Sequence, residues 1–392
     1  MSFALPRQAR RGVALLALAV ALVAAVPAAA LPRRSLPATG EPSDRQAAEI
    51  ARIAKPRSER LAARPATADI ESTAGSAAPS SGEEPVSEPA VRGGARGTGS
   101  PSREAFLPGF ADRQSAEIVA QNYGRGNANT VYQYTDLKVP TDVVKDYPYR
   151  AAGYFYFQAQ DNVWYWCTAS LISNSILVTA GHCVHDGGNT EKGWIKQGFF
   201  YPARSKDAYP YGRAKTRELF TTDGWYSGGK LDRGYDVGLV VLDIRANTNR
   251  EIGADTGYLG FCHKNCLSKY WFLSALGYPY NYYNGKQMSQ GHHLGKSDGA
   301  DFEFGSGMEG GSSGGPQVAN LGELDSSGAK SDYATRNVVF AVTSWGYNNA
   351  NLKIQGASPL SGPNNNNGFK QMYNEACTEA RRLHGKNSCD PL

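Results

Sequence analysis

The first 120 residues of this 392-residue chain contain no tyrosine, tryptophan, cysteine or histidine. Their only aromatic side chains are Phe3, Phe106 and Phe110, although the whole chain has 22 tyrosines and 6 tryptophans. Large aromatic side chains provide much of the apolar area that a protein core buries. We therefore expect the folded part of the chain to lie after this region.

The remainder of the chain lacks a strong charge of either sign. From residue 138 onward, 25 Lys and Arg oppose 23 Asp and Glu, a difference of +2, compared with +5 for the whole chain. Without a basic run there is little to hold a phosphate backbone, so we expect no nucleic-acid partner. Long apolar stretches are also missing after residue 31, so we expect no stable membrane insertion of the processed protein.

The N-terminus has the features of a secretory signal peptide. Three arginines precede an apolar stretch at residues 12–26, and alanines at 28–30 provide the small side chains that a signal peptidase accepts. The alternative is a retained membrane anchor, but this stretch is shorter than the roughly 20 residues that cross a bilayer as a helix. We expect residues 1–30 to be removed and the protein to be secreted to the extracellular space.

Residues 31–130 are predicted to be a low-complexity pro-segment or linker. Twelve of the 21 prolines precede residue 120, and the region offers too little apolar surface to offset the entropy cost of ordering, so we expect it to be largely disordered. Two near-identical heptapeptides interrupt it, at residues 44–50 and 112–118. They are either parts of a pro-segment that folds against the mature protein or two unrelated alanine-rich helices.

The six cysteines are an even set, and export to an oxidising compartment favours three disulfides. Sequence alone leaves many pairings open, and we expect nearest neighbours to pair: Cys167 with Cys183, Cys262 with Cys266, and Cys377 with Cys389. Zinc binding by Cys262, His263 and Cys266 is the alternative, but no second ligand pair stands nearby. We therefore expect no metal and no cofactor.

After residue 130 the sequence is typical of a β-protein with one terminal helix. Short runs of Val, Ile, Tyr, Phe and Trp alternate with Gly, Asn, Asp and Pro clusters, which favours a barrel or a sandwich. The predicted strands are residues 153–158, 164–171, 176–179, 237–242, 271–276 and 338–345. Apolar residues then recur at helical spacing before Gly385, which predicts one amphipathic C-terminal helix: Phe369, Met372, Ala376, Ala380 and Leu383.

Two segments offer a base and an acid. His182 follows the apolar strand at 176–179, where a neutral imidazole can act as a general base or have only a structural role. Asp236 leads into a strand that we interpret as buried, and a carboxylate there is costly without a partner. Its competitors are Asp232, which lies further out in a polar loop, and Asp243, at the far end of the strand.

A third segment, residues 310–316, reads Gly-Gly-Ser-Ser-Gly-Gly-Pro. Its glycines allow a sharp turn that presents Ser313 as a nucleophile and leaves backbone amides free to face an oxyanion. A flexible linker is the alternative, although a linker is not expected between aromatic strands with a proline closing it. The Gly-x-Ser-x-Gly pattern also occurs in α/β-hydrolase esterases, but the acid and the histidine of that fold follow the nucleophile, and here only His384 does.

The chain order His182, Asp236, Ser313 and the sequence around each residue resemble the chymotrypsin-like, or trypsin-like, serine proteases. The resemblance covers roughly residues 140–392 and rests on the segments 167–172, 179–183, 235–239, 311–316 and 344–346. The Gly-Tyr-Pro sequence at 277–279 is similar to the secreted bacterial branch that includes the glutamyl endopeptidases. The domain expected at residues 131–392 is therefore a serine protease catalytic domain.

The resemblance implies an all-β fold of two packed antiparallel β-barrels with a C-terminal α-helix, and a catalytic site in the cleft between the barrels. It implies a serine endopeptidase in which Asp236 orients His182, and His182 takes the proton from Ser313. Ser313 would then form an acyl-enzyme with a protein or peptide substrate.

Other site residues follow from the same resemblance. The backbone amides of Gly311 and Ser313 would form the oxyanion hole. The segment Ser344, Trp345 and Gly346 would pair with the backbone of an extended substrate. The disulfide between Cys167 and Cys183 would match the one beside the family's histidine.

Three positions depart from the family pattern. Ser312 replaces the aspartate of animal members, so zymogen control cannot use a new N-terminal ammonium paired with that residue. Gly307, six residues before Ser313, replaces the acid that binds basic side chains in trypsin-like members, which leaves cleavage after Lys or Arg unsupported. The candidates left to line this pocket with negative charge are Glu309, Asp301 and Glu303. Thr343 replaces a histidine of glutamyl endopeptidases, so specificity for glutamate is unsupported too.

The main alternative function is a secreted binding protein that keeps the scaffold without catalysis; an esterase is the weaker one. A monomer is expected in either case. His292, His293 and the tyrosine-rich residues 278–283 suggest a metal or glycan site, but we favour loop residues under an aromatic-rich surface.

Overall fold

The computed structural model describes residues 31–37, 55–56, 59–61, 90–100, 132–228, 233–245, 247–264, 266, 270–297, 302–322, 335–347, 353–361 and 368–392. The signal peptide expected at 1–30, the repeated heptapeptides, Asp232 and Asp301 lie outside these residues. The chain from Leu31 onward forms one compact unit.

Six antiparallel strands close the first barrel in the order β10-β11-β8-β7-β6-β9, because β9 also pairs with β10. Their bounds are β6 Ala152–Gln158, β7 Trp164–Leu171, β8 Ile176–Thr179, β9 Gln197–Pro202, β10 Ala214–Thr221 and β11 Gly238–Leu242. Alternate side chains of these strands point inward and bury an apolar core that includes Phe155, Leu177 and Val240.

Six further strands close the second barrel in the order β16-β13-β14-β15-β18-β17, with β16 pairing back to β17. Their bounds are β13 Tyr270–Gly277, β14 Ser289–Ser297, β15 Phe302–Gly305, β16 Pro316–Ala319, β17 Val338–Tyr347 and β18 Ile354–Pro359. Phe302, Phe304 and Phe340 are buried inside it. The two closed antiparallel barrels confirm the expected chymotrypsin-like architecture.

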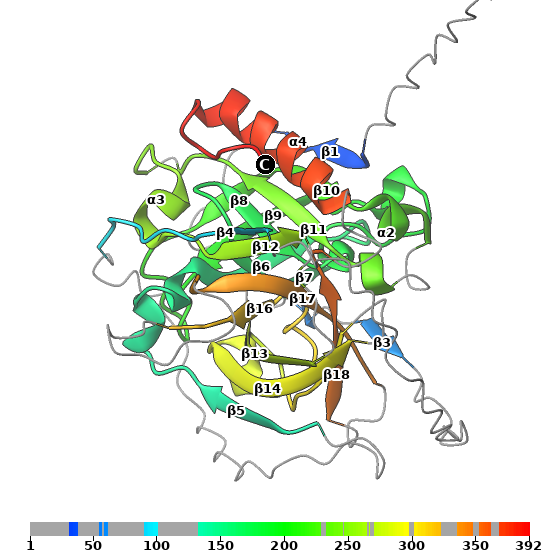
Figure 1. Ribbon diagram of the computed structural model, residues 1–392. Helices are drawn as coiled ribbons and strands as arrows, with labels where there is room; N and C mark the ends of the chain where they lie inside the picture. Colours follow the sequence, from blue (N-terminus) through cyan, green and yellow to red (C-terminus); the bar gives the residue numbers. More distant parts are fainter. Residues whose placement is uncertain are drawn as a thin grey trace, which may run out of the picture. The chain divides into compact units, whose positions relative to one another are not determined.

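The C-terminal helix α4, Gly368–His384, confirms the predicted amphipathic helix. Its apolar face, which includes Phe369, Met372 and Ala376, joins a core cluster to which both barrels contribute, with Val241 from the first and Val339 from the second. Figure 1 shows α4 lying beside β10 and β11. The helix therefore covers apolar surface at the junction of the barrels.

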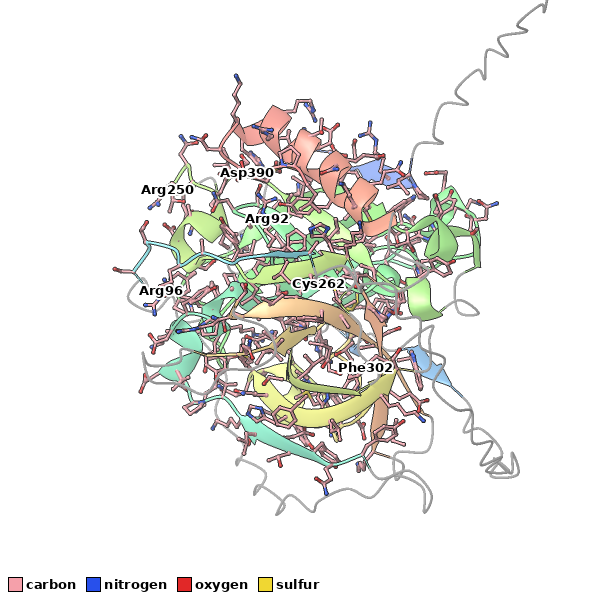
Figure 2. The ribbon with its side chains drawn as sticks, viewed as in Figure 1. Arg92, Arg96, Arg250, Cys262, Phe302 and Asp390 are labelled. Carbon is pink, nitrogen blue, oxygen red and sulfur yellow. A yellow bond between two sulfur atoms is a disulfide. The ribbon has the colours of Figure 1, made fainter. Side chains whose placement is uncertain are left out.

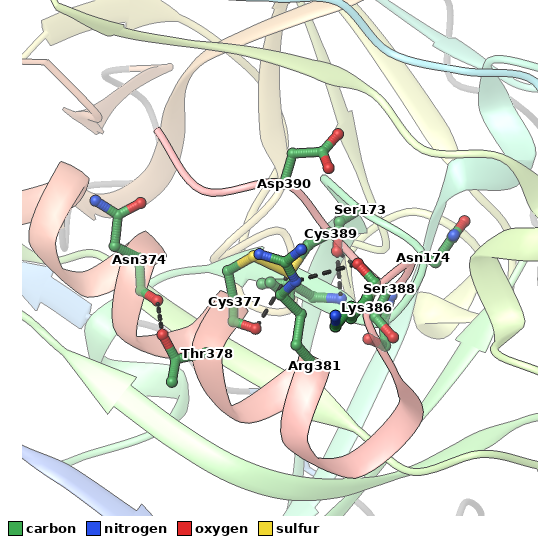
Figure 3. Close-up of a disulfide and its surroundings, with 12 residues drawn as sticks. Ser173, Asn174, Asn374, Cys377, Thr378, Arg381, Lys386, Ser388, Cys389 and Asp390 are labelled. Carbon is green, nitrogen blue, oxygen red and sulfur yellow. Dashed lines mark hydrogen bonds between the residues drawn. A yellow bond between two sulfur atoms is a disulfide. The ribbon is translucent and has the colours of Figure 1, made fainter.

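The three disulfides join the nearest neighbours, as expected: Cys167 with Cys183, Cys262 with Cys266, and Cys377 with Cys389. Zinc binding by Cys262 and Cys266 is therefore wrong, because their sulfurs are consumed in a covalent bond and are not thiolates. Figure 3 shows the disulfide that ties the segment after α4 back onto the helix.

Strands β1 and β4, which precede residue 131, pair with strands of the folded unit. Strand β1, Arg33–Ser35, pairs with β10, and Leu31 and Leu36 on either side of it are buried. Strand β4, Ala90–Arg92, pairs with β12, Gly260–Lys264, and Arg92 forms an ion pair with Asp390 (Figure 2). The disorder expected for most of this region therefore does not extend to these segments, because β12 and the part of β10 beyond its pairing with β9 supply their backbone hydrogen bonds.

The other described elements are short. The strands are β2 Lys55–Pro56, β3 Glu59–Leu61 and β5 Tyr134–Lys138, and the α-helices are α2 Asp223–Gly228 and α3 Ile252–Thr256. The 3-10 helices are η1 Val143–Lys145, η2 Tyr149–Ala151, η3 Gly181–Cys183, η4 Glu191–Gly193, η6 Arg233–Tyr235 and η7 Tyr283–Gly285. None of the helices that the structure describes has the length and apolar character needed to span a bilayer.

Candidate active site

His182 and Asp236 lie at the same end of two paired strands. Strand β8 ends at Thr179, which is paired with Gly238 at the start of β11. His182 follows in η3 and Asp236 precedes β11, so the strand register brings the two side chains together. The His182 Nδ1 and Asp236 Oδ2 atoms are 2.7 Å apart, and both side chains are fully buried.

The Asp236 carboxylate has three hydrogen-bond donors. Oδ1 accepts from the His182 backbone N–H at 2.7 Å, and Oδ2 also accepts from Ser344 Oγ at 2.6 Å. These bonds offset the cost of removing a carboxylate from water. They also fix Nδ1 of His182 as the protonated nitrogen, which leaves Nε2 as the basic one. Nε2 is buried and has no hydrogen-bond partner among the described residues.

Asp243 does not reach this cluster. It follows the opposite end of β11, its side chain is 28% exposed, and it pairs with Arg217 at 3.9 Å. Of the two described carboxylates that the sequence offered as partners for His182, only Asp236 contacts the imidazole.

The turn that carries Ser313 depends on two glycines. Gly311 and Gly314 have φ angles of +96° and +77°, in the left-handed region that favours glycine. A Cβ atom on Gly314 would lie 2.0 Å from Thr179 Oγ1 and 2.3 Å from the Thr168 carbonyl oxygen. On Gly311 it would lie 2.3 Å from Trp166 Nε1. The turn is therefore packed tightly between β7 and the end of β8.

Backbone contacts bring the Ser313 turn beside the His182 turn. The Thr168 N–H donates to the Ser313 carbonyl at 2.8 Å, and the Gly314 N–H donates to the Thr343 carbonyl at 2.6 Å. The Cβ position of Gly314 is 2.9 Å from the backbone nitrogen of Ala180, two residues before His182. The three segments singled out in the sequence thus meet, although Nε2 of His182 forms no hydrogen bond with Ser313.

Two amides near Ser313 have fixed orientations. The Gly310 carbonyl accepts from Tyr280 N–H at 2.7 Å, and the Ser312 carbonyl accepts from Gly315 N–H at 2.9 Å. In a trans peptide the next N–H points the opposite way, so these bonds orient the amides of Gly311 and Ser313. Neither amide donates a hydrogen bond among the described residues. Both are therefore available to an acceptor.

Ser344, Trp345 and Gly346 lie in β17, next to the Ser313 turn. Ser344 contacts Asp236, and Trp345 is buried, with its ring 2.0 Å from the Cβ position of Gly356 in β18. The sequence pointed to Ser344 only for its backbone. Its hydroxyl bond to Asp236 could not be found from a motif, because 108 residues separate the pair.

Gly307 contacts a carboxylate that the sequence did not single out. Its backbone N–H donates to Asp136 Oδ2 at 2.7 Å, and the Tyr282 hydroxyl donates to the same oxygen at 3.1 Å. Glu303 instead accepts from Tyr132, and the Glu309 backbone N–H donates to Asn281. Asp136 is the described carboxylate that contacts Gly307.

The residues with metal-ligand chemistry are engaged otherwise. Cys167, His182 and Cys183 have ligand atoms within 4.8 Å of one another, but both sulfurs form the disulfide. His292 and His293 lie in β14, so their interpretation as loop residues is wrong; cross-strand pairing with β13 overrides the weak strand preference of this Gly- and His-rich sequence. His292 bonds Ser274 and Gln290, and His293 bonds Gln317. Burial lowers the pKa of His293 to about 3.

A protein-family model described as Trypsin matches residues 144–255, a stretch that includes His182 and Asp236. This stretch is similar to the trypsin family. The chain is 27% identical over 170 residues to a glutamyl endopeptidase from Bacillus licheniformis, with 43% of the chain and 49% of the relative covered. It is 28% identical over 147 residues to a protein named extracellular metalloprotease from Bacillus subtilis, with 37% and 44% covered. The matches span about half the length of these relatives.

Solved structures similar to the trypsin-like chain include protease Anisep from Arthrobacter nicotinovorans, with a TM-score of 0.49, 19% identity and coverage of 62% of this chain and 99% of that one. A Glu endopeptidase structure in complex with MPD has a TM-score of 0.45, 20% identity and coverage of 62% and 95%. The family model and the glutamyl endopeptidase make the chain similar to the trypsin-like serine proteases.

Proposed function

We propose that this trypsin-like protein is a secreted serine endopeptidase in which Ser313 is the nucleophile, His182 the general base and Asp236 the residue that orients His182. The observation that carries the proposal is the buried His182–Asp236 hydrogen bond of 2.7 Å, which leaves Nε2 of His182 without a partner beside the Ser313 turn. A buried basic nitrogen without a partner costs folding free energy, and a hydrogen-bond donor that reaches it would recover part of that cost. The Ser313 hydroxyl is the donor that chain order and packing favour.

The reaction would proceed through an acyl-enzyme. The Ser313 oxygen attacks the substrate carbonyl carbon while its proton passes to His182 Nε2, and the imidazolium then gives this proton to the departing amine as the C–N bond breaks. In the second half of the reaction, water attacks the carbonyl carbon of the acyl-enzyme while its proton passes to His182 Nε2. The imidazolium then returns this proton to the Ser313 oxygen as the ester bond breaks and the acid product leaves. Asp236 stays ionised throughout and stabilises the imidazolium, helped by the hydrogen bond from Ser344.

The amides of Gly311 and Ser313 would stabilise the negative charge on the substrate oxygen. Because their carbonyl partners already hold them in position, they need no reorganisation when the charge develops. A donor of this kind contributes roughly 3 to 4 kcal/mol to transition-state stabilisation in comparable proteases. The backbone of Ser344, Trp345 and Gly346 would bind the substrate as an added strand, with Gly307 further along the same site.

The proposal includes export and processing. We propose residues 1–30 as the signal peptide, 31–130 as the pro-segment and 131–392 as the catalytic domain, with protein or peptide substrates, a monomeric state and an extracellular location. One relative is named an extracellular metalloprotease, which gives that protein the same location. Neither a cofactor nor a metal takes part in the proposed steps.

Labelling with a fluorophosphonate tests the proposal against the non-catalytic alternative. Intact mass of the secreted, processed protein should show one adduct, mapped to Ser313, and none in Ser313→Ala protein. The unmodified mass also gives the mature N-terminus. Absence of an adduct on disulfide-bonded processed protein would favour the binding protein, and turnover of esters without any peptide hydrolysis would favour the esterase.

A further inference from the structure

Asp136 is a buried carboxylate at the proposed substrate site with an oxygen that has no partner. It lies in β5, which pairs with β14 at Gly291, and only 1% of the residue is exposed. Oδ2 accepts from Gly307 N–H and from the Tyr282 hydroxyl, whereas Oδ1 has no hydrogen-bond partner among the described residues. Most buried polar atoms in proteins are paired, so this oxygen is open to a hydrogen-bond donor that the described residues do not supply.

Two glycines make room for this carboxylate. A Cβ atom on Gly307 would lie 2.9 Å from Asp136 Oδ2, and one on Gly291 would lie 2.8 Å from Oδ1. A side chain at either position would displace the carboxylate, so both glycines form its seat. The hydroxyl groups of Tyr282 and Tyr134 are also within 3.3 Å of the Gly307 Cβ position. The carboxylate and the two hydroxyl groups thus surround this position, and an ionised carboxylate there would attract an organic cation.

The charge of Asp136 is only partly compensated. Burial raises its pKa to about 6, against the opposing effects of the Gly307 amide, Tyr282 and Lys353. Above that pH the site holds a carboxylate with one unsatisfied oxygen. A cation that reaches this oxygen would replace the missing partner and lower the cost of burying the charge.

We propose that Asp136 is the specificity-determining residue of the site, and that it selects substrates with Lys or Arg on the acyl side of the scissile bond. This inference rests on the proposed peptidase function. It gives the acid a new source: the sequence lacks it at position 307, and β5 supplies it beside the place that a side chain at 307 would take. Asp136 is separated from Gly307 by 171 residues, which is why no motif reveals it.

Ligand binding tests the site without requiring turnover. Processed Ser313→Ala protein is titrated with benzamidine, an aromatic cation, and with benzamide, its neutral counterpart. We expect benzamidine to bind the Ser313→Ala protein about 10- to 100-fold more tightly than the Ser313→Ala/Asp136→Asn protein, because the double variant lacks the charged hydrogen bond. Benzamide should not distinguish the two. Glu303→Gln is the matched control, because it removes another carboxylate of the second barrel, one that accepts from Tyr132, and it should leave the benzamidine affinity unchanged.

Hydrolysis of matched peptides completes the test in the protein that retains Ser313. The kcat/KM for Lys and Arg substrates should fall in Asp136→Asn, and that for Phe and Ala substrates should not. Equal benzamidine affinity in both proteins, or an unchanged preference for Lys and Arg, would overturn the role of Asp136. Loss of all turnover with benzamidine binding intact would count against the proposed function alone.

A separate observation concerns the leader. Strand β3 pairs in parallel with β17, with Glu59 opposite Trp345, Arg60 opposite Gly346 and Leu61 opposite Tyr347. Strand β2 pairs in parallel with β7, with Pro56 opposite Trp166. Figure 1 shows β3 beside the second barrel. Residues 55–56 therefore pair with one barrel and residues 59–61 with the other.

Both pairing positions adjoin the proposed catalytic site. Trp166 Nε1 is 2.3 Å from the Cβ position of Gly311, and Trp345 and Gly346 belong to the proposed substrate-binding edge. The edge of a β-strand has one row of free backbone groups, so a leader strand and a substrate strand cannot both use it. We infer that residues 55–61 inhibit the enzyme in the unprocessed protein by occupying this edge, which also rests on the proposed function.

A peptide of residues 52–64 tests this inhibition on the processed enzyme. We expect it to compete with substrate, and we expect the Arg60→Ala peptide to do so equally because its backbone is unchanged. An Arg60→Pro peptide should inhibit about tenfold less, because proline lacks the backbone N–H and disrupts the ladder. Equal inhibition by all three peptides, or none by any, would overturn the inference. An inactive processed enzyme would instead refute the proposed function.

Discussion

At the scale of single residues, the Asp236 carboxylate links sequence to proposed chemistry. Its burial is tolerated because three donors surround it: the His182 backbone, the His182 ring and the Ser344 hydroxyl. The identity of Asp236 and His182 could be predicted from the strand that each adjoins. The Ser344 contact could not, because it depends on how β17 passes the end of β11.

Asp236→Asn should reduce kcat/KM by roughly 10⁴-fold, because an amide no longer fixes the His182 tautomer or stabilises the imidazolium. Ser344→Ala removes only one of the three donors and should cost about tenfold. Both variants are measured by peptide turnover, with circular dichroism to show that they fold. An Asp236→Asn enzyme within tenfold of wild type would contradict the assigned role.

Asp136 should make stability depend on pH in the direction opposite to a salt-bridged aspartate. Burial raises its folded-state pKa from 3.8 to about 6, so the folded protein binds more protons than the unfolded chain between these values. Stability should therefore fall as pH rises from about 4 to 6 and then level off. The groups facing it are Tyr134, Tyr282 and Lys353, and the two tyrosines have raised pKa values and do not titrate here.

The measurement is the Tm of wild-type and Asp136→Asn protein across this pH range. Because the variant lacks the titrating group, the wild-type Tm should decline relative to it between about pH 4 and 6. If the Tm of the wild type minus that of the variant stays constant or grows with pH, burial does not raise the pKa of the Asp136 carboxyl.

At the scale of elements, the Ser313 turn shows why a glycine-rich sequence can form a rigid structure. Gly314 has no space for a side chain against β7 and β8, and its left-handed φ angle suits few other residues. The sequence indicated a sharp turn here, and the structure adds the two strands that enclose it. By contrast, Gly322 has φ +110° with no atom within 4 Å of its Cβ position.

This contrast predicts the cost of alanine at each glycine. Gly322→Ala should lower the free energy of unfolding by about 1 to 2 kcal/mol, from backbone strain alone. Gly314→Ala adds an overlap with backbone atoms and should cost at least about 3 kcal/mol or prevent folding. Urea denaturation of both variants, and soluble yield where Gly314→Ala does not fold, provide the comparison. Equal costs would mean that the turn can relax.

The elements also show the limit of strand prediction from composition. The six runs rich in aromatic and branched residues that were predicted as strands are confirmed, and their ends differ from the prediction by up to two residues. They are β6, β7, β8, β11, β13 and β17. Strands such as β14, Ser289–Ser297, and β18, Ile354–Pro359, were not predicted. Their sequences mix Gly, His, Gln and Pro, and they form because neighbouring strands supply backbone partners.

At the scale of the whole molecule, α4 and the disulfide between Cys377 and Cys389 lie at the junction between two barrels. The core beneath α4 draws on both barrels, so the helix stabilises their contact as well as its own fold. The order of the chymotrypsin-like motifs sufficed to predict this architecture. The participation of residues 31–37 and 90–100 could not be predicted, because their composition alone favours disorder.

The disulfides should contribute according to the loops that they close. Cys377 and Cys389 are 12 residues apart and Cys262 and Cys266 are 4 apart, so replacing each pair by serine should cost about 3 and about 2 kcal/mol, respectively. Denaturant unfolding of the two double variants measures the difference. A larger loss from the shorter loop would show that native packing, and not chain entropy, dominates.

The hydrogen bonds of β1 and β4 bear on what would be purified after maturation. Cleavage within residues 101–131 would separate β4 from the rest of the backbone, yet its pairing with β12, the ion pair of Arg92 with Asp390 and the bond from Arg150 to Gly97 would all persist. The first product of cleavage would then be a two-chain particle in which β3 stays paired with β17, so full activity would also require release of the leader chain. This particle would elute as one species under native conditions and separate into two chains in denaturant. Edman degradation of the natively homogeneous sample would return two N-terminal sequences.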